Sequence, residues 1–240
     1  MRKFDYKKIN YVNKTGFYSG YTFILDNIPE SSKVLDIGCG EGFIASKLKE
    51  KQCFIHGCDI KLPCAGFFDN TTAVDLEQIE FDKFGMGDFD IVLAADVIEH
   101  LSSPEDFLNK LYNATSSGNI KLIITTPNIA FIGMRLLLLF GRFNYSENGI
   151  LDFTHKRLFT FASLKKLLAE SGFVVIRTEG IPAPFPLVFG NGLISSALLK
   201  MNRLLIKILR SLFSYQIGIV ARPAPTFDKM LEDSIKNGLA

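Results

Sequence analysis

The sequence predicts an α/β fold in which helices cover both faces of one doubly wound, seven-stranded sheet. From residue 33 onward, apolar runs of strand length alternate with runs of helix length, which is typical of a parallel sheet with crossover helices. The first apolar run, at 33–37, ends in a glycine-rich turn that leads into a helix, as at the ligand-binding edge of such a sheet. With 240 residues, the chain is long enough to bury a large core.

Seven strands and five helices are expected in order along the chain. The strands are expected at 33–37, 54–58, 71–74, 89–95, 120–125, 173–179 and 215–221. The helices are expected at 41–51, 104–115, 129–140, 160–171 and 192–213. The first strand, KVLDI, is apolar enough to be buried inside the sheet, as parallel strands are.

The whole chain, residues 1–240, is expected to form a single domain with additions that cap it. Residues 1–30 are rich in aromatic side chains and are expected to form an N-terminal helix, which covers either the mouth of a cofactor site or simply the core. Insertions at 128–158 and 181–213 are expected to complete the cap. The longest uncharged stretch, 180–199, contains three prolines and three glycines, which disfavours a membrane-spanning helix.

The composition argues against a nucleic-acid-binding protein and against a disulfide scaffold. The formal net charge is +2 with acidic and basic residues well mixed, so no nucleic-acid partner is expected. The four cysteines, at 39, 53, 58 and 64, form no C-x-x-C pair and are expected to be reduced thiols. The N-terminus has no apolar core of the kind found in secretory signals, so a cytoplasmic location is expected. The oligomeric state is not predicted.

The turn after the first strand favours a cationic ligand. It lies in the run VLDIGCGEG at 34–42, where Gly38 and Gly40 carry no Cβ and let the backbone approach a ligand closely. A dinucleotide-binding fingerprint would have its third glycine where this chain has Phe43. Asp36, just before the turn, would repel a pyrophosphate but attract a ligand with an ammonium and a sulfonium group. The turn therefore points to S-adenosylmethionine.

Three stretches of the sequence resemble motifs of a known enzyme family. The run at 34–42 is similar to the first motif of class I S-adenosylmethionine-dependent methyltransferases, and the run FDIVLAADVIEHL at 89–101 is similar to their fourth. The stretch from Gly149 to Phe173 resembles a bacterial subgroup often associated with surface-glycan assembly. Together the three motifs span most of residues 30–180.

The resemblance implies a Rossmann-like fold and an enzyme that transfers a methyl group from S-adenosylmethionine, with S-adenosylhomocysteine as the product. It also implies that the two C-terminal strands, 173–179 and 215–221, form a reversed hairpin at the edge of the sheet, with the last strand antiparallel.

In an open α/β sheet the ligand lies at the carboxyl ends of the strands, so each cofactor contact is expected just after a strand. Asp36 ends the first strand and is expected to hold the methionine ammonium; capping the following helix is the alternative. The backbone of Gly38 and Gly40 is expected to line the methionine and ribose portions, with Cys39 as a small filler in the turn.

Further contacts are expected after the second and fourth strands. Asp59, beside Ile60, ends the second strand at about the spacing at which an acid pairs with ribose hydroxyls. Ala94 and Ala95 end the fourth strand, and their small side chains are expected to leave room beside the sulfonium.

After the third strand, Asp75 is expected to accept a hydrogen bond from the adenine amino group, with Leu76 packing on the ring. Asp69 and Asp82 lie in the same loop-rich region, so a purely structural role for Asp75 stays open.

Methyl transfer is a direct displacement, and alignment of the acceptor with the methyl group supplies most of the acceleration. An oxygen acceptor would still profit from a base, and histidine is the usual one near neutral pH. Of the three histidines, His155 lies in the insertion where the resembled enzymes place acceptor-binding residues, so it is expected to be the base or to position the acceptor. The structural alternatives are a cap on the helix at 160–171 or a pair with Asp152.

The other two histidines are expected to be structural. His100 follows the fourth strand and is expected to support its loop against Glu99. The Glu99-His100 pair is similar to one in metal-assisted methyltransferases, but no further carboxylate ligands are identifiable, so no metal is expected. His56 falls within a strand, as satisfied core histidines do.

The expected helix at 192–213 carries four basic residues at helical spacing: Lys200, Arg203, Lys207 and Arg210. A basic amphipathic helix can lie on an anionic membrane surface, but an ordinary surface helix that covers the sheet gives the same pattern. A second apolar run, at 134–140, lies beside the expected acceptor site. These features are compatible with a lipid-linked acceptor and with peripheral membrane contact through 192–213.

The sequence thus predicts an S-adenosylmethionine-dependent O-methyltransferase. By resemblance, its acceptor is a sugar of a surface glycan or the lipid-linked precursor of that glycan. A small lipophilic acceptor such as a quinone precursor is the second interpretation. A scaffold that binds the cofactor without catalysis and a dinucleotide dehydrogenase are the remaining alternatives.

Overall fold

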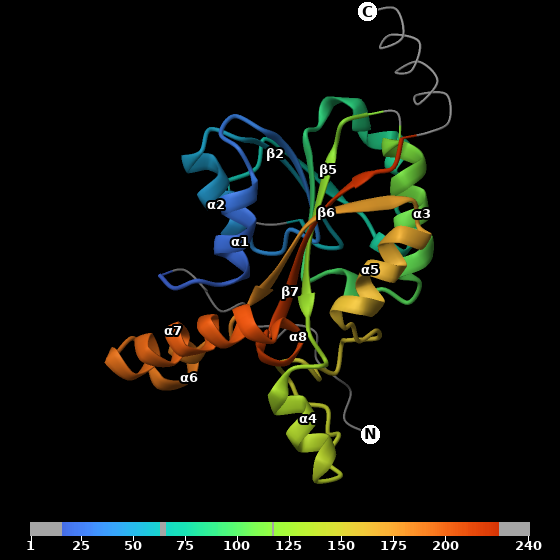
Figure 1. Ribbon diagram of the computed structural model, residues 1–240. Coiled ribbons are helices and arrows are strands. Elements are labelled where there is room, and N and C mark those ends of the chain that lie inside the picture. Colours follow the sequence, from blue (N-terminus) through green and yellow to red (C-terminus); the bar gives the residue numbers. More distant parts are fainter. Residues whose placement is uncertain (1–15, 63–65, 117, 226–240) are drawn as a thin grey trace, which may run out of the picture.

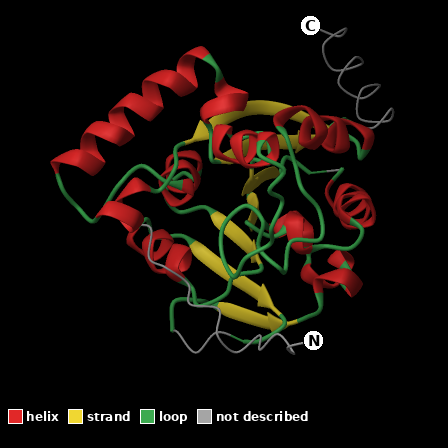
Figure 2. Cartoon of the chain, turned by 90° about the horizontal axis from the view of Figure 1, so that it is seen from below, coloured by secondary structure: helices red, strands yellow, loops and turns green. Residues whose placement is uncertain are grey.

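The computed structural model describes residues 16–62, 66–116 and 118–225 of the chain. These residues form one mixed sheet with helices on both faces (Figure 1). Figure 2 views the fold from below and shows helices on either side of the strands.

The sheet has seven strands, and they match the predicted positions to within two residues at most ends. Their bounds are β1 Lys33–Ile37, β2 Phe54–Asp59, β3 Asn70–Ala73, β4 Ile91–Ala95, β5 Lys121–Pro127, β6 Phe173–Ile181 and β7 Gln216–Pro223. The order is β3-β2-β1-β4-β5-β7-β6. Strands β1 to β5 pair in parallel, whereas β7 is antiparallel to both of its neighbours. The predicted doubly wound sheet with an antiparallel last strand is therefore confirmed.

The described helices are α1 Gly20–Asn27, α2 Phe43–Glu50, α3 Pro104–Thr115, α4 Ile132–Leu139, α5 Phe161–Glu170, α6 Phe185–Phe189, α7 Leu193–Ile208 and α8 Arg210–Phe213. Short 3₁₀ turns are η2 Leu76–Gln78, η3 Phe81–Phe84, η4 Met86–Asp88 and η5 Ile98–His100. None of the helices in the described part of the chain combines the length and apolar character that crossing a bilayer requires.

Successive side chains of each strand point to opposite faces of the sheet, so they contribute to two apolar layers, one on each face. Leu35 and Ile37 of β1 belong to the layer closed by α3 and α5, which includes Leu108 and Leu164. The opposite layer contains Val34 of β1 together with side chains of α1 and α2, among them Phe23, Ile24 and Leu48. Both layers keep the central strands rigid, and this fixes where the strand ends lie.

The N-terminal helix α1 covers the core, and residues 1–15 of the predicted N-terminal cap lie outside the described residues. Phe23 of α1 packs so closely on Gly218 of β7 that a Cβ there would lie 2.7 Å from the ring. The first residue of α1, Gly20, lies against Gln216 and Thr125, at the carboxyl edge of the parallel strands. Helix α1 is therefore core cover whose first turn borders that edge.

The predicted helix at 192–213 is interrupted. The backbone of Leu209 is not helical (φ −134°, ψ 75°), so α7 and α8 are separate helices. The interruption turns the chain back toward the sheet, where β7 begins at Gln216. The unpredicted short helix α6 carries a proline in its first turn, a position that tolerates proline because the missing N–H has no partner there.

Helices α4, α6 and α7 project from the end of the sheet at which the parallel strands finish (Figure 1). Helix α4 is three residues shorter at its start than predicted, since it begins at Ile132 rather than at residue 129. The only buried residue of α4 is Met134, so the helix stands clear of the core.

Two buried asparagines fasten these projecting parts to the sheet. The amide of Asn128 donates to the carbonyls of Ser211 and Ser214, at 2.8 Å each. The side chain of Asn202 in α7 accepts from the backbone N–H of Ala183 (3.0 Å) and donates to the carbonyl of Phe213 (2.9 Å). Each amide therefore satisfies backbone groups that would otherwise be buried without partners.

Replacing Asn202 with alanine should lower the free energy of unfolding by about 2 kcal/mol, because two buried backbone groups lose their partners. Chemical denaturation followed by circular dichroism measures the loss. Asn191→Ala changes an exposed asparagine in the same segment and should leave the midpoint unchanged. Equal stability of the two variants would contradict the anchoring role of Asn202.

Candidate cofactor and active site

The turn between β1 and α2 has a backbone that requires glycine. Gly38, Gly40 and Gly42 have φ values of +69°, +50° and +77°, in the left-handed region that other residues rarely adopt. A Cβ at Gly38 would lie 2.5 Å from a methyl group of Val97, in the loop after β4. The N–H of Gly38 donates to the carbonyl of Cys58 in β2 (2.7 Å). The turn is therefore packed between the ends of β2 and β4.

Asp36 is a buried carboxyl group at the end of β1, with only 2% of its surface exposed. Burial raises the pKa of this carboxyl to about 7, and the negative charge of nearby Asp59 raises it further. Asp36 does not cap α2, because the N-cap position is Gly42 and no side chain caps that helix. A cation bound beside Asp36 would favour its charged form, which is the chemistry expected for a methionine ammonium.

Asp59 braces the glycine turn from the end of β2. One carboxylate oxygen accepts from the N–H of Gly40 (3.0 Å), and the other accepts from the N–H of Lys61 (3.2 Å). Each carboxylate oxygen has a further lone pair, so the group can still accept from two vicinal hydroxyls. The neighbouring Ile60 is exposed beside it.

The residues after β3 border the same turn. Leu76 is half-buried, and one of its methyl groups lies 3.8 Å from the point that a Cβ at Gly38 would occupy. Asp75 is exposed and caps η2, since its side chain accepts from the N–H of Glu77 (3.0 Å). Asp75 therefore has a structural role at the start of η2.

Several other polar groups singled out in the sequence serve the fold. The carboxylate of Asp69 pairs with Lys49 at 2.5 Å and accepts from the N–H of Ile55. Burial raises the pKa of the Cys39 thiol, which disfavours the thiolate that a nucleophile needs. The Nε2 atom of His56 shares a hydrogen bond with the Thr72 hydroxyl (2.8 Å), as expected of a core histidine.

At the end of β4, Ala94 is buried and Ala95 is half-buried, and both side chains are small. The next residue, Asp96, adopts φ +53°. Its carboxylate accepts from the hydroxyl of Thr125 in β5 (2.8 Å) and from the amide of Gln216 in β7 (2.8 and 2.9 Å). Asp96 thereby joins three strands at the edge of the site.

Asp96 and Gln216 lie at the same edge of the sheet, and the sequence analysis missed both. An acid directly after a strand was the available signal for Asp96, as it was for Asp36 and Asp59. Nothing in the sequence indicates Gln216, because its position depends on β7 pairing beside β5.

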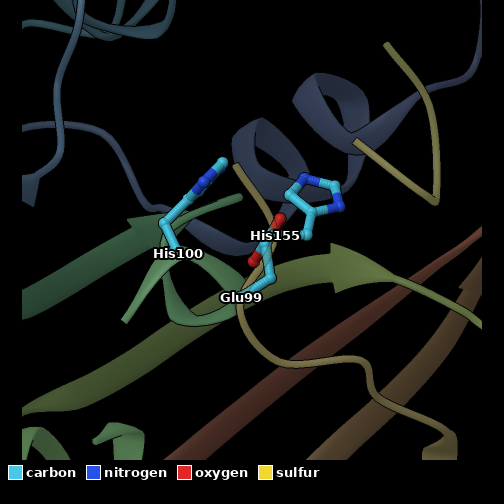
Figure 3. Close-up of side chains that lie close together, drawn as sticks. All are labelled: Glu99, His100 and His155. Carbon is cyan, nitrogen blue, oxygen red and sulfur yellow. The ribbon is translucent and has the colours of Figure 1, made fainter. Parts of the chain in front are cut away.

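Glu99, His100 and His155 come together beyond the end of β4 (Figure 3). The first two lie on η5, and His155 comes from the long connection between α4 and α5. That connection is fixed to η5 by the N–H groups of Lys156 and Arg157, which donate to the carbonyl of Glu99 at 2.8 and 3.0 Å. The imidazole centres of the two histidines are 4.9 Å apart.

Both imidazoles are oriented by backbone carbonyls. Nδ1 of His100 donates to the carbonyl of Thr154 (3.2 Å), and Nδ1 of His155 donates to that of Ile150 (2.9 Å). Because a carbonyl can only accept, each Nδ1 carries the proton and each Nε2 of a neutral ring keeps its lone pair. Burial and the neighbouring imidazole of His155 lower the pKa of His100, which favours its neutral form.

The structural alternatives for His155 do not hold. Helix α5 is capped by the side chain of Thr160 in a capping box with Ser163. The carboxylate of Asp152 accepts from the N–H and hydroxyl of Thr154 (2.8 and 2.6 Å), whereas His155 reaches Asp152 only through its backbone N–H.

A family model described as "Methyltransferase domain" matches residues 13–178. The chain belongs to this methyltransferase family. The predictions of a class I S-adenosylmethionine-dependent methyltransferase and of its cofactor are therefore confirmed.

Curated enzymes similar to this methyltransferase include distant relatives. A ubiquinone biosynthesis O-methyltransferase from Pseudomonas aeruginosa is 27% identical over 104 residues, which cover 40% of this chain and 44% of the relative. The chain thus spans less than half the length of that curated relative.

Solved structures support the fold. A SAM-dependent methyltransferase from Archaeoglobus fulgidus has a TM-score of 0.56 and 23% identity, and the match covers 82% of this chain and 89% of that one. The 1,6-didemethyltoxoflavin-N1-methyltransferase of Burkholderia thailandensis, solved with bound 1,6-didemethyltoxoflavin and S-adenosylhomocysteine, has a TM-score of 0.53 and 13% identity. The match covers 85% of this chain and 76% of that one.

The affinity for S-adenosylmethionine should rise as the pH is raised from about 6 to about 8, because the bound cation favours the charged form of Asp36. The pKa of this group is about 7 in the free protein, so protonation competes with binding below that pH. There, each pH unit should weaken binding by up to about tenfold. Isothermal titration calorimetry across this range measures the slope.

Asp36→Asn should weaken binding at pH 8 by at least about tenfold and flatten the pH profile. Asp88→Asn, which changes an exposed carboxyl far along the chain, is the matched control and should keep the wild-type slope. A wild-type affinity that does not change with pH would refute the assignment of Asp36 to the ammonium.

Proposed function

We propose that this methyltransferase moves the methyl group of S-adenosylmethionine to a hydroxyl oxygen of a lipophilic acceptor that it meets at a membrane surface. The buried carboxyl of Asp36 beside the glycine turn is the observation that supports S-adenosylmethionine as the methyl donor. The apolar helices that project from the same end of the sheet support a lipophilic acceptor.

The cofactor contacts that we propose are those predicted from the sequence. Asp36 holds the methionine ammonium, and the two oxygens of Asp59 accept from the ribose hydroxyls. The remaining contacts are made by Gly38, Cys39, Gly40, Ile60, Asp75, Leu76, Ala94 and Ala95. The small side chains that end β4 leave the sulfonium open toward Glu99, His100 and His155.

The reaction is an in-line displacement. The acceptor oxygen forms a bond to the methyl carbon, the bond from that carbon to sulfur breaks, and the electron pair stays on sulfur to give S-adenosylhomocysteine. The hydroxyl must lose its proton on the way. His155 is the residue that we propose takes this proton or holds the acceptor in line.

The exposed side chains of α4 favour an apolar acceptor. Leu139 and Phe140, at the end of the helix, are each 76% exposed, although both are large and apolar. Such side chains gathered on a projecting helix are typical of a surface that contacts lipid or a partner.

Helix α7 adds a second surface of the same kind. Leu193 and Ile194 are 91% and 70% exposed, and Lys200 and Lys207 lie exposed on the same helix. Helix α7 projects away from the sheet, so the sheet-covering alternative does not explain its apolar side chains (Figure 1). Exposed lysines beside apolar side chains suit an anionic bilayer.

Two acceptor classes fit these surfaces. A quinone precursor with a prenyl tail is favoured, because the distant curated relatives are named for ubiquinone biosynthesis. A sugar on a lipid-linked glycan precursor is the second candidate, and the resemblance of residues 149–173 to glycan-associated methyltransferases favours it.

S-adenosylhomocysteine should accumulate when the protein and S-adenosylmethionine are given a prenylated catechol in lipid vesicles. The same catechol without its tail should react at least about tenfold more slowly, because each buried methylene adds about 0.8 kcal/mol to binding. A lipid-linked sugar in the same vesicles tests the second acceptor. Cofactor binding with no product from any of the three would contradict the enzymatic proposal and support a scaffold.

Membrane contact should depend on the projecting helices. In a flotation assay, the wild type should float with anionic vesicles. The double variant Leu139→Asp/Phe140→Asp and the single variant Leu193→Asp should stay in the unbound fraction. The control Ile176→Asp changes an apolar side chain on β6 that is 53% exposed, and this variant should float normally. Lys200→Gln/Lys207→Gln should weaken binding to anionic vesicles by about 1 kcal/mol per lysine. Flotation of all variants to the same extent would rule out the proposed surface.

A further inference from the structure

We propose that Glu99, His100 and His155 bind a divalent first-row transition metal ion, which holds the acceptor hydroxyl beside the methyl group. The metal site itself is independent of the proposed function, whereas its role toward the acceptor rests on it. The proposal departs from the sequence-based expectation that no metal is bound.

The three side chains offer ligand atoms at nearly the separation that one ion requires. A carboxylate oxygen and two imidazole nitrogens all lie within 4.8 Å of one another. Ligands bound at about 2.1 Å from one tetrahedral ion lie about 3.4 Å apart. The three side chains lie close together (Figure 3), and a contraction of up to about 1.4 Å between their ligand atoms completes the site.

Hydrogen bonds orient the three ligand side chains in the way that is usual at metal sites. Metal-bound histidines almost always donate their second ring nitrogen to a carbonyl or carboxylate. His100 and His155 both do so through Nδ1, to Thr154 and Ile150, which leaves Nε2 as the ligand atom. The hydroxyl of Thr126 donates to Oε2 of Glu99 (2.9 Å) and fixes this carboxylate in turn.

The site is also rigid, although its residues are far apart in the sequence. Glu99 is 1% exposed, and its carbonyl binds the N–H groups of Lys156 and Arg157. The side chain of Lys156 pairs with Glu77 on η2 (2.9 Å), and that of Arg157 pairs with Glu105 on α3. These contacts keep His155 opposite η5 without an ion, so little ordering is needed to bind one.

The donor set indicates the kind of ion. Imidazole nitrogen favours Zn²⁺, Fe²⁺, Ni²⁺ and similar ions, whereas Mg²⁺ and Ca²⁺ prefer sites made of oxygen. Two imidazoles with one carboxylate leave a site charge of +1 around a divalent ion. An oxyanion from the acceptor would neutralise this charge.

Three protein ligands leave coordination positions open for the acceptor. A hydroxyl bound to such an ion has a lowered pKa and loses its proton to water, so the oxygen is a nucleophile near neutral pH. That oxygen then bonds to the methyl carbon while the carbon–sulfur bond breaks and its electron pair stays on sulfur. In this arrangement His155 positions the acceptor through the ion and takes no proton.

The test is metal titration of the full-length protein, freed of metal by chelation, with Zn²⁺, Mn²⁺ and Co²⁺ as probes. Calorimetry should give one ion per chain for the wild type. Glu99→Gln, His100→Ala and His155→Ala should each weaken binding by at least about tenfold. His56→Asn changes the one histidine outside the proposed site and is the matched control. This variant should bind the metal ion as the wild type does. Co²⁺ bound by the wild type should show visible absorption that His155→Ala loses.

Measuring S-adenosylmethionine binding by Glu99→Gln distinguishes failure of the metal-site proposal from failure of the proposed cofactor site. Retained cofactor affinity with lost metal affinity supports the metal site and shows that the variant is folded. Absence of metal binding by the wild type, or unchanged metal affinity in His155→Ala, overturns the metal site. Methyl transfer that survives complete chelation overturns the role toward the acceptor.

Discussion

The structure depends on a constraint of parallel sheets: all carboxyl ends meet at one edge, and the order of the strands reverses between β1 and β4. At that reversal the chain places a turn that only glycine can form, at Gly38, and a buried carboxyl, at Asp36. Burial raises the pKa of that carboxyl to about 7. The loops after β2, β3 and β4 then pack around the turn, so each adds its own polar group to one place.

The sheet and the position of the glycine turn could be predicted from the sequence because their signals are local. An apolar run followed by an acid and a glycine-rich turn marks a strand end without knowledge of its neighbours, and Asp36 and Asp59 lie where this pattern puts them. The interruption at Leu209 could not be predicted, since it follows from the need to return the chain to β7. The helical spacing of the basic residues continues past Leu209, so it gives no sign of the interruption.

The histidine cluster could not be assembled from the sequence for a similar reason. His100 and Thr154 are 54 residues apart in the chain. They are brought together by the backbone contacts of Glu99 with Lys156 and Arg157 and by the ion pairs of these two residues with Glu77 and Glu105. The sequence showed the Glu99-His100 pair but gave no means of recognising His155 as its third member. Long-range pairing therefore converts three ordinary side chains into one chemical unit.

The hydrogen bonds between Asp96 and Gln216 have a consequence for how the molecule is made. Among the described strands β7 comes last in the sequence, yet it lies between β5 and β6 and brings Gln216 to Asp96. A nascent chain that lacks it has neither a closed sheet nor a finished edge around Asp96. Ligand-binding competence must therefore arise late, in the same cooperative event that inserts the C-terminal strand, and a premature stop before residue 216 leaves both layers of the core incomplete.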